Sequence, residues 1–270
     1  ISLAFGIVFA TVITLLLVAC ATSPTGRRQL MLVSEDTAIS SSKEAYVQTL
    51  KPLQKEGKVD NDPAMTARVQ KITAYLVAQA VRMRPETADW EWTIKVIDDP
   101  ETVNAWCMAG GKMAMYSGLI LKLDATDDEI AQVMGHEIAH ALANHQAEKM
   151  SVAIASTLGV VAVGAASDNS GVAMAGAAAA AALAIKLPNS RTAESEADRI
   201  GIELAAKAGY NPKAAVSLWE KMGKVSGEGP PQFLSTHPAP ANRKQTLSNL
   251  VPQMMPYYQK KGKRPVFKLD

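Results

Sequence analysis

Apolar residues recur at helical spacing in two stretches of the first third of the chain. The segment from Ser34 to Leu53 predicts a helix with Glu35 and Asp36 in its first turn, where carboxylates favour the helix dipole. A second helix is predicted from about Asp62 to Met83, with a proline directly after Asp62. Its apolar positions share one face and are Val69, Ile72, Leu76 and Ala80.

After these two helices, the spacing of the apolar residues changes to every second residue. Apolar and polar residues alternate from Trp90 to Asp98, which predicts a strand. Two further short runs, Val103–Met108 and Lys112–Tyr116, flank a pair of glycines and predict extended segments. From Thr126 the chain is predicted to be helical almost to its end. Thr126 starts this region, because a glutamate three residues later completes a capping box.

The stretch from Ser151 to Leu187 is rich in alanine, glycine and valine, and Asp168 and Lys186 carry its only charges. The turn residues Asp168–Gly171 divide it into two apolar halves. Each half has ~16 residues, fewer than the ~20 that span a bilayer. Two interpretations remain open: a helical hairpin that packs on the domain, or a segment that dips into a bilayer surface.

The run from Ile1 to Ala21 is mostly apolar, and no charged residue precedes Arg27. Near its end lies Leu17-Val18-Ala19-Cys20, which resembles the lipobox of bacterial lipoproteins. The resemblance implies a signal peptide over residues 1–19 and lipidation of Cys20, which begins a lipidated tether over residues 20–28. Within it, Thr22–Gly26 is expected to be flexible. An uncleaved transmembrane anchor is the alternative. In either case we expect the remainder outside the cytoplasm beside a membrane, with the periplasmic side of an outer membrane as the favoured location.

Composition narrows the remaining choices. With 48% hydrophobic and 20% charged residues, the chain is not a disordered polymer. A net charge of +2 argues against nucleic acid as the main partner. Two cysteines are too few for a disulfide scaffold or a zinc finger built from cysteines. We expect one domain over residues 29–270, of unknown oligomeric state.

The chain has four histidines, and two of them form His136-Glu137-Ile138-Ala139-His140. On a helix, residues four apart differ by ~40° around the axis, so His136 and His140 can point at one metal ion. Glu137 lies within the same ~100° arc and can act on a metal-bound water. Zinc accepts histidine nitrogens and leaves a position for water in catalytic sites.

A third ligand is best sought downstream. His145 lies one residue short of the HExxHxxGxxH spacing and, on a continuous helix, faces away from His136, so we expect a structural role. Glu194 and Asp198 share one helical face, so Glu194 can complete a His-His-Glu set while Asp198 hydrogen-bonds a ligating histidine. Glu196 lies ~200° from Glu194, so both cannot face the metal.

HEIAH followed by SRTAESEAD resembles the zinc metallopeptidase family that includes HtpX and the CAAX prenyl endopeptidases, and is most similar to its lipid-anchored LoiP-like branch. The resemblance implies an α+β, mostly α, zincin-like (gluzincin) domain with a small mixed sheet and a two-helix active-site core. It places the third ligand of one Zn²⁺ ion at Glu194 and its supporting carboxylate at Asp198. Asn104 and Ala105 resemble the edge strand that holds a peptide. Thr236-His237-Pro238 and Arg243 resemble the family's carboxy-terminal motif.

These residues predict a zinc endopeptidase that acts on unfolded or damaged envelope proteins. Glu137 would serve as general base, and His237 would help to stabilise the oxyanion. Arg191 and Arg243 are expected to form structural ion pairs. The alternative is a chaperone-like outer-membrane assembly factor that only holds client chains in its cleft.

Overall fold

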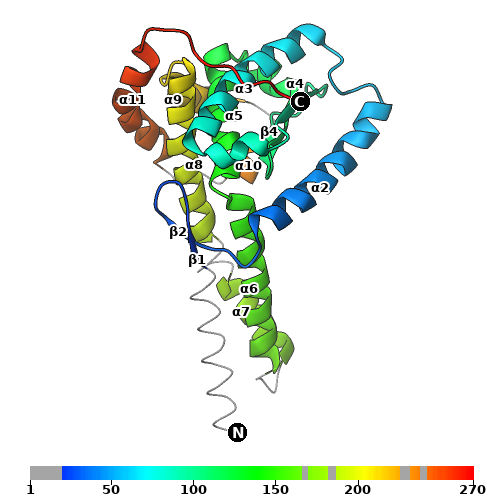
Figure 1. Ribbon diagram of the computed structural model, residues 1–270. Coiled ribbons are helices and arrows are strands. Elements are labelled where there is room, and N and C mark those ends of the chain that lie inside the picture. Colours follow the sequence, from blue (N-terminus) through cyan, green and yellow to red (C-terminus); the bar gives the residue numbers. More distant parts are fainter. Residues whose placement is uncertain (1–19, 166–169, 182–186, 226–231, 238–241) are drawn as a thin grey trace.

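The computed structural model describes residues 20–165, 170–181, 187–225, 232–237 and 242–270, and most of them are helical (Figure 1). The predicted signal peptide, residues 1–19, lies outside the described residues. The α-helices are α2 (Glu35–Lys55), α3 (Pro63–Met83), α4 (Ser117–Leu123), α5 (Asp127–Leu142), α6 (His145–Ala165), α7 (Ser170–Ala181), α8 (Leu187–Ala208), α9 (Ala214–Met222), α10 (Gln232–Thr236) and α11 (Arg243–Gln259).

The main sheet is small and mixed. Its strands are β3 (Thr93–Ile97), β4 (Ala105–Met108) and β5 (Lys112–Tyr116), in the order β3-β5-β4. β3 runs parallel to β5, and β4 runs antiparallel to it. The α+β, mostly helical prediction is therefore confirmed. β3 begins later than expected, because Trp90 closes a 3-10 helix at Pro85–Asp89 and Trp92 is fully buried in the core.

The helices begin where their side chains can cap them. Ser34 accepts a hydrogen bond from the backbone N–H of Thr37, and Asp62 caps α3 in the same way. Thr126 and Glu129 form the predicted reciprocal capping box at the start of α5. These caps explain why the sequence pattern located the three helix starts to within a residue.

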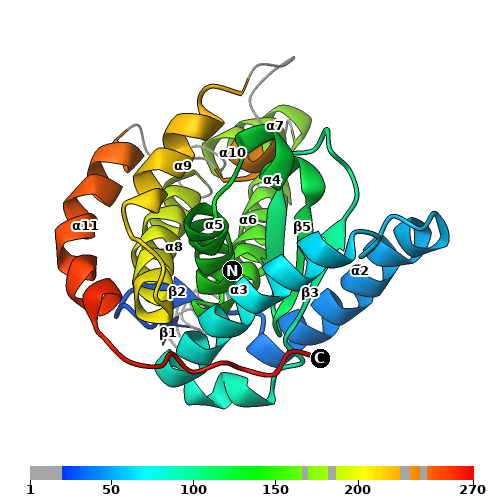
Figure 2. The ribbon, with the colours of Figure 1, turned by 90° about the horizontal axis from the view of Figure 1, so that it is seen from above.

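Helix α5 is the centre of the fold. It contacts α3, α8, α9 and β4, and Figure 2 shows it between α8 and the sheet. Ile130, Met134 and Ile138 have no exposed surface, and each such side chain contributes about 1.5–3 kcal/mol by burial. The helix that carries the HExxH residues is thus held on all sides.

Helices α6 and α7 pack against each other and extend away from the body of the domain (Figure 1). The buried residues of α6 lie mostly in its first two turns, while Leu158 is 63% exposed and Val172 of α7 is 69% exposed. The interpretation in which the hairpin packs on the domain is therefore wrong for its far half. The turn predicted from Asp168 begins in residues 166–169, which lie outside the described residues.

The segment expected to be a flexible tether is folded, so that expectation is wrong. β1 (Cys20–Thr22) pairs antiparallel with β2 (Arg28–Leu30), and β2 packs on α6. The intervening turn is closed by a 2.8 Å hydrogen bond from Ser23 N to Arg27 O. Backbone pairing and buried side chains, which sequence periodicity over so few residues does not reveal, hold this segment.

α5 and α8 approach most closely at two glycines. A Cβ atom on Gly201 would lie 2.7 Å from the backbone nitrogen of His136, and one on Gly135 would lie 2.7 Å from the carbonyl oxygen of Gly201. We expect Gly201→Ala to destabilise the domain by about 1–3 kcal/mol through overpacking, measured by denaturant unfolding. Gly176→Ala on α7 is the matched control, because its added methyl group meets no atom within 4 Å. Equal stability of Gly201→Ala and wild type would contradict this packing.

Candidate metal centre

α5 and α8 bring three of the predicted ligands together. The Nε2 atoms of His136 and His140 are 3.0 Å apart. Oxygens of the Glu194 carboxylate lie 3.3 Å from His136 Nε2 and 3.4 Å from His140 Nε2. His136 and Glu194 are buried, and His140 is nearly so. The downstream glutamate therefore converges on the HExxH histidines.

His237, directly after α10, is the fourth member of this group. Its Nδ1 lies 3.3 Å from His136 Nε2 and 3.2 Å from Glu194 Oε1. Its ring stacks on Phe233 at 4.5 Å between centroids. One ligand atom from each of the four residues lies within 4.8 Å of the others. At this spacing His237 can serve as a fourth metal ligand. That role differs from the oxyanion stabilisation predicted for it from the sequence.

The distances within this group fit a metal ion with four ligands in a tetrahedral arrangement. Zinc–ligand bonds of 2.0–2.2 Å place neighbouring ligand atoms ~3.3 Å apart. Separations of 3.0–3.4 Å join His136, His140 and Glu194 to one another, and His237 to His136 and Glu194. Three imidazole nitrogens and a carboxylate oxygen are also the donors that zinc accepts. Beside them, the buried Oε1 of Glu137 receives no hydrogen bond from the described residues and lies 3.3 Å from His237 Nε2.

Burial and neighbouring charges set the protonation of these groups. Burial lowers the pKa of His140, so its ring is neutral and able to bind a metal at neutral pH. Burial alone would lower the pKa of His136, but hydrogen bonds to Asp198 and Glu194 raise it to about 9. Hydrogen bonds from His136 and His237 keep the pKa of Glu194 below its usual range despite burial. Burial raises the pKa of Glu137, which makes it a stronger base.

Asp198 lies behind the first histidine. Its Oδ1 is 3.0 Å from His136 Nδ1, the nitrogen turned away from the metal group. Arg243 donates a 2.5 Å hydrogen bond to Asp198 and stacks 3.7 Å over the Trp219 ring. Arg243 thus forms the expected structural ion pair. Arg191 is exposed, and no ion pair joins it to another residue that the structure describes.

Two residues near the second histidine have a contact that sequence reasoning missed. α5 ends at Leu142, and Asn144 turns the chain with a φ of +54°, so His145 is not on a continuation of that helix. Its Nδ1 lies 2.8 Å from His140 Nδ1, and its Nε2 lies 3.1 Å from Glu196 Oε2. His145 therefore stands outside the metal group, as expected, but contacts the predicted ligand His140. The sequence signal for Glu196 was only its place two residues after Glu194.

The predicted substrate strand lies at the edge of the described sheet. Tyr116 donates a hydrogen bond to Asn104 O, and Ala105 begins β4, which packs beside α5. The other edge of β4 pairs with no strand among the residues described. Cys107 is a free, half-buried cysteine on this strand. The position suits peptide binding, and that role stays a prediction.

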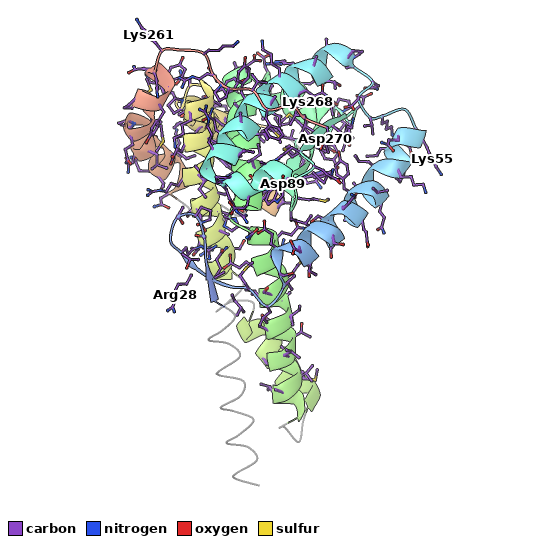
Figure 3. The ribbon with its side chains drawn as sticks, in the orientation of Figure 1. Arg28, Lys55, Asp89, Lys261, Lys268 and Asp270 are labelled. Atoms are coloured by element: carbon purple, nitrogen blue, oxygen red, sulfur yellow. The ribbon has the colours of Figure 1, made fainter. Side chains whose placement is uncertain are left out.

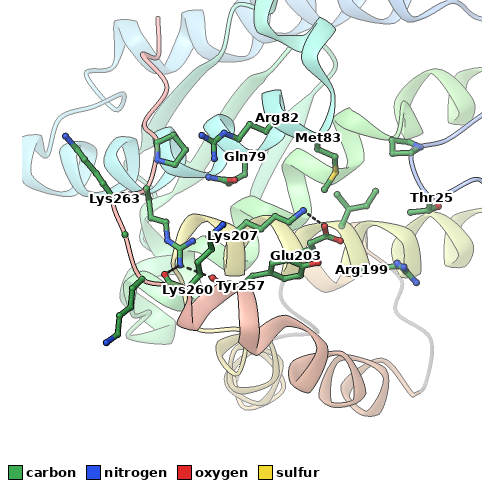
Figure 4. Close-up of a pocket in the computed structure, with 16 residues that line it drawn as sticks. Thr25, Gln79, Arg82, Met83, Arg199, Glu203, Lys207, Tyr257, Lys260 and Lys263 are labelled. Atoms are coloured by element: carbon green, nitrogen blue, oxygen red, sulfur yellow. Dashed lines mark hydrogen bonds and ion pairs between the residues drawn. The ribbon is translucent and has the colours of Figure 1, made fainter.

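A cavity of about 650 Å³ lies beside α8, where Arg199, Glu203 and Lys207 line it (Figure 4). Its side chains carry seven positive charges against the single carboxylate of Glu203, in a chain whose net charge is +2. The cations are Arg82, Arg199, Lys207, Lys260, Lys261, Lys263 and Arg264. Because it contains no member of the metal group, this cavity is not the candidate peptidase site; its charge attracts anions.

The comparisons with known proteins agree with this arrangement. Residues 63–251 match the model of peptidase family M48. The chain is 36% identical over 180 residues to the mitochondrial metalloendopeptidase OMA1 of Saccharomyces cerevisiae, which covers 63% of this chain and 50% of that protein. It is 30% identical over 243 residues to the OMA1 metalloendopeptidase of Bos taurus, covering 86% of this chain and 46% of that protein.

A bacterial relative is also similar. The putative beta-barrel assembly-enhancing protease of Vibrio cholerae is 31% identical over 209 residues, covering 74% of this chain and 41% of that protein. The chain spans about half or less of the length of these relatives. The family model matches most of the chain, and the structure brings together a His-His-Glu group that can bind a metal. The chain therefore belongs to peptidase family M48.

Proposed function

We propose that the protein is a zinc-dependent endopeptidase of the gluzincin type. His136, His140 and Glu194 would hold one Zn²⁺ ion, and Glu137 would act as general base. The observation that carries the proposal is the convergence of these ligand atoms at 3.0–3.4 Å in a chain of a peptidase family. Zinc, when bound, lowers the pKa of a water ligand and polarises a carbonyl group.

The chain's own residues would prepare the reaction. Glu137, with its raised pKa, takes the proton of the attacking water and passes it to the leaving amine. Asp198 fixes the orientation and tautomer of His136 through its far nitrogen. An extended peptide binds beside Asn104 and Ala105 by adding a strand to β4. Such binding relies on backbone groups, so it suits unfolded chains.

His237 gives the proposed site a closed arrangement. Its Nδ1 lies 3.3 Å from His136 Nε2 and 3.2 Å from Glu194 Oε1, so it would occupy the position that a catalytic zinc site leaves to water. We therefore propose that His237 withdraws before a water molecule can be activated. Phe233, on which its ring stacks, sits on the five-residue helix α10, which is held by a hydrogen bond from Phe233 N to Val103 O.

We propose that the chain belongs to the lipid-anchored LoiP-like branch and that its cellular role is proteolytic quality control of unfolded or damaged envelope proteins. The names of the relatives support a protease, and one of them is named for beta-barrel assembly. A chaperone-like assembly factor that holds chains in the same cleft is the second candidate. The buried, raised-pKa Glu137 favours cutting, because holding a chain needs no base.

We further propose that Cys20 is lipidated and that the α6–α7 hairpin enters the surface of the same membrane. The part of α6 between His145 and Gly164 is apolar and long enough to cross a membrane. Most residues from Ile154 to Val163 are exposed, and this stretch is only ~15 Å long, so it reaches the interface of a ~30 Å hydrocarbon layer without crossing it. β2, which pairs with the Cys20 strand, packs on this helix.

Glu137→Gln tests the catalytic assignment. The amide keeps the shape of the side chain but cannot accept the proton, so casein cleavage should fall by about 10²–10⁴-fold. Metal analysis should still find one zinc per chain, since Glu137 is not a ligand. Undiminished cleavage would refute the assigned base. Unchanged rescue of client folding together with lost cleavage would favour the holding role.

His237→Ala tests the closed arrangement. Removing the fourth nitrogen should free a coordination position for water and raise casein cleavage, with zinc retained by the other three ligands. If His237 instead stabilised the oxyanion, the same variant would lose about 10²–10³-fold in rate. Initial rates at equal zinc occupancy separate the two results.

Leu158→Glu with Val161→Glu tests the membrane contact. Both side chains are exposed on α6, at 63% and 53%. Charging them should weaken binding of the Cys20→Ser protein to phospholipid vesicles by about tenfold or more in a flotation assay, because each buried apolar side chain is worth about 1.5–3 kcal/mol. Val47→Glu, at a 56% exposed position on α2, is the control. Equal loss in all variants would contradict hairpin insertion.

A further inference from the structure

The turn between β1 and β2 places a cation between two buried carboxylates. Arg27 donates to Glu148 through both terminal nitrogens, at 2.7 and 2.6 Å. Its Nε donates to Glu196 Oε2 at 2.6 Å. The Arg27 side chain is 18% exposed, and the two carboxylates are 2–4% exposed. Charge-assisted hydrogen bonds of this geometry are strong and directional, so the turn is held firmly against α6 and α8.

Glu196 collects further donors from the same turn. The hydroxyls of Ser23 and Thr25 both donate to its Oε1. Three residues of a five-residue segment thus bind one carboxylate on α8. A segment that served only as a spacer would need none of these contacts. The arrangement fixes the carboxylate of Glu196 rather than simply covering it.

Glu196 in turn faces the metal group through one histidine. Its Oε2 is 3.1 Å from His145 Nε2, and His145 Nδ1 is 2.8 Å from His140 Nδ1. The opposite nitrogen of His140, Nε2, points at His136 and Glu194. An unbroken series of hydrogen bonds therefore joins the turn to a proposed metal ligand. Outer partners of this kind set the tautomer and ring orientation of a ligating histidine.

We propose that Arg27 and its turn are positioning residues for the metal centre, acting on His140 through Glu196 and His145. The inference rests on the proposed zinc site and deepens it. The turn follows Cys20 by only a few residues, so the segment that would carry the lipid is also a support of the metal site. Displacing this turn from α8 would release Glu196, loosen His145 and weaken the hold of His140 on the ion.

Arg27→Ala and Arg28→Ala, made in the full chain, form a matched pair. Arg28 is the next residue, is exposed and points away from the body (Figure 3). Zinc affinity, measured by competition with a chromophoric chelator, should fall by about 10–100-fold in Arg27→Ala and stay at the wild-type value in Arg28→Ala. The visible spectrum of the cobalt-substituted protein should also change only in Arg27→Ala, since it reports the geometry of the ligands.

Wild-type zinc affinity and cobalt spectrum in a folded Arg27→Ala protein would overturn the proposal. If Arg27→Ala fails to fold, Thr25→Val decides the matter, because it keeps the shape and the arginine but removes one donor to Glu196: a smaller loss of zinc affinity supports the proposal, and no loss refutes it. Failure of the wild type to bind zinc would refute the proposed function instead.

Discussion

The metal group depends on how closely α5 and α8 approach. Gly135 and Gly201 let the two backbones meet directly before His136, and any side chain there would push them apart. Asp198 then lies opposite His136, while Glu194, one turn away, reaches both histidines. Two pairs of residues spaced four apart, one on each helix, thus face each other. The chemistry of the site is set by this contact.

Charge is the second constraint on this contact. Glu194, Asp198 and Arg243 are all buried next to His136, where an unpaired charge would be costly. Arg243 lies against both carboxylates, and its guanidinium stacks on Trp219. Since α11, which begins at Arg243, also packs on α8, the carboxy-terminal helix completes the electrostatic balance of the site. The site is therefore built from both halves of the domain.

On the side of His140, the turn between β1 and β2 balances the buried charges. Arg27 balances Glu148 and Glu196 there, as Arg243 balances Asp198 and Glu194 on the other side. Each proposed histidine ligand thus has a partner on its far nitrogen, Asp198 for His136 and His145 for His140. The α6–α7 hairpin extends from this region. The part proposed to contact the membrane would therefore lie close to the residues that support His140.

The sequence by itself determined the local features. The capping residues and apolar periods predicted the starts of α2, α3 and α5, and HEIAH with SRTAESEAD identified the candidate ligands, because helix geometry relates residues three or four apart. Only tertiary structure decided the rest. The ordered Ser23–Arg27 turn, the support of His140 by His145, the position of His237 and the exposed hairpin all depend on contacts between distant segments. Such contacts leave no period in the sequence, since burial is set by whichever elements happen to pack there.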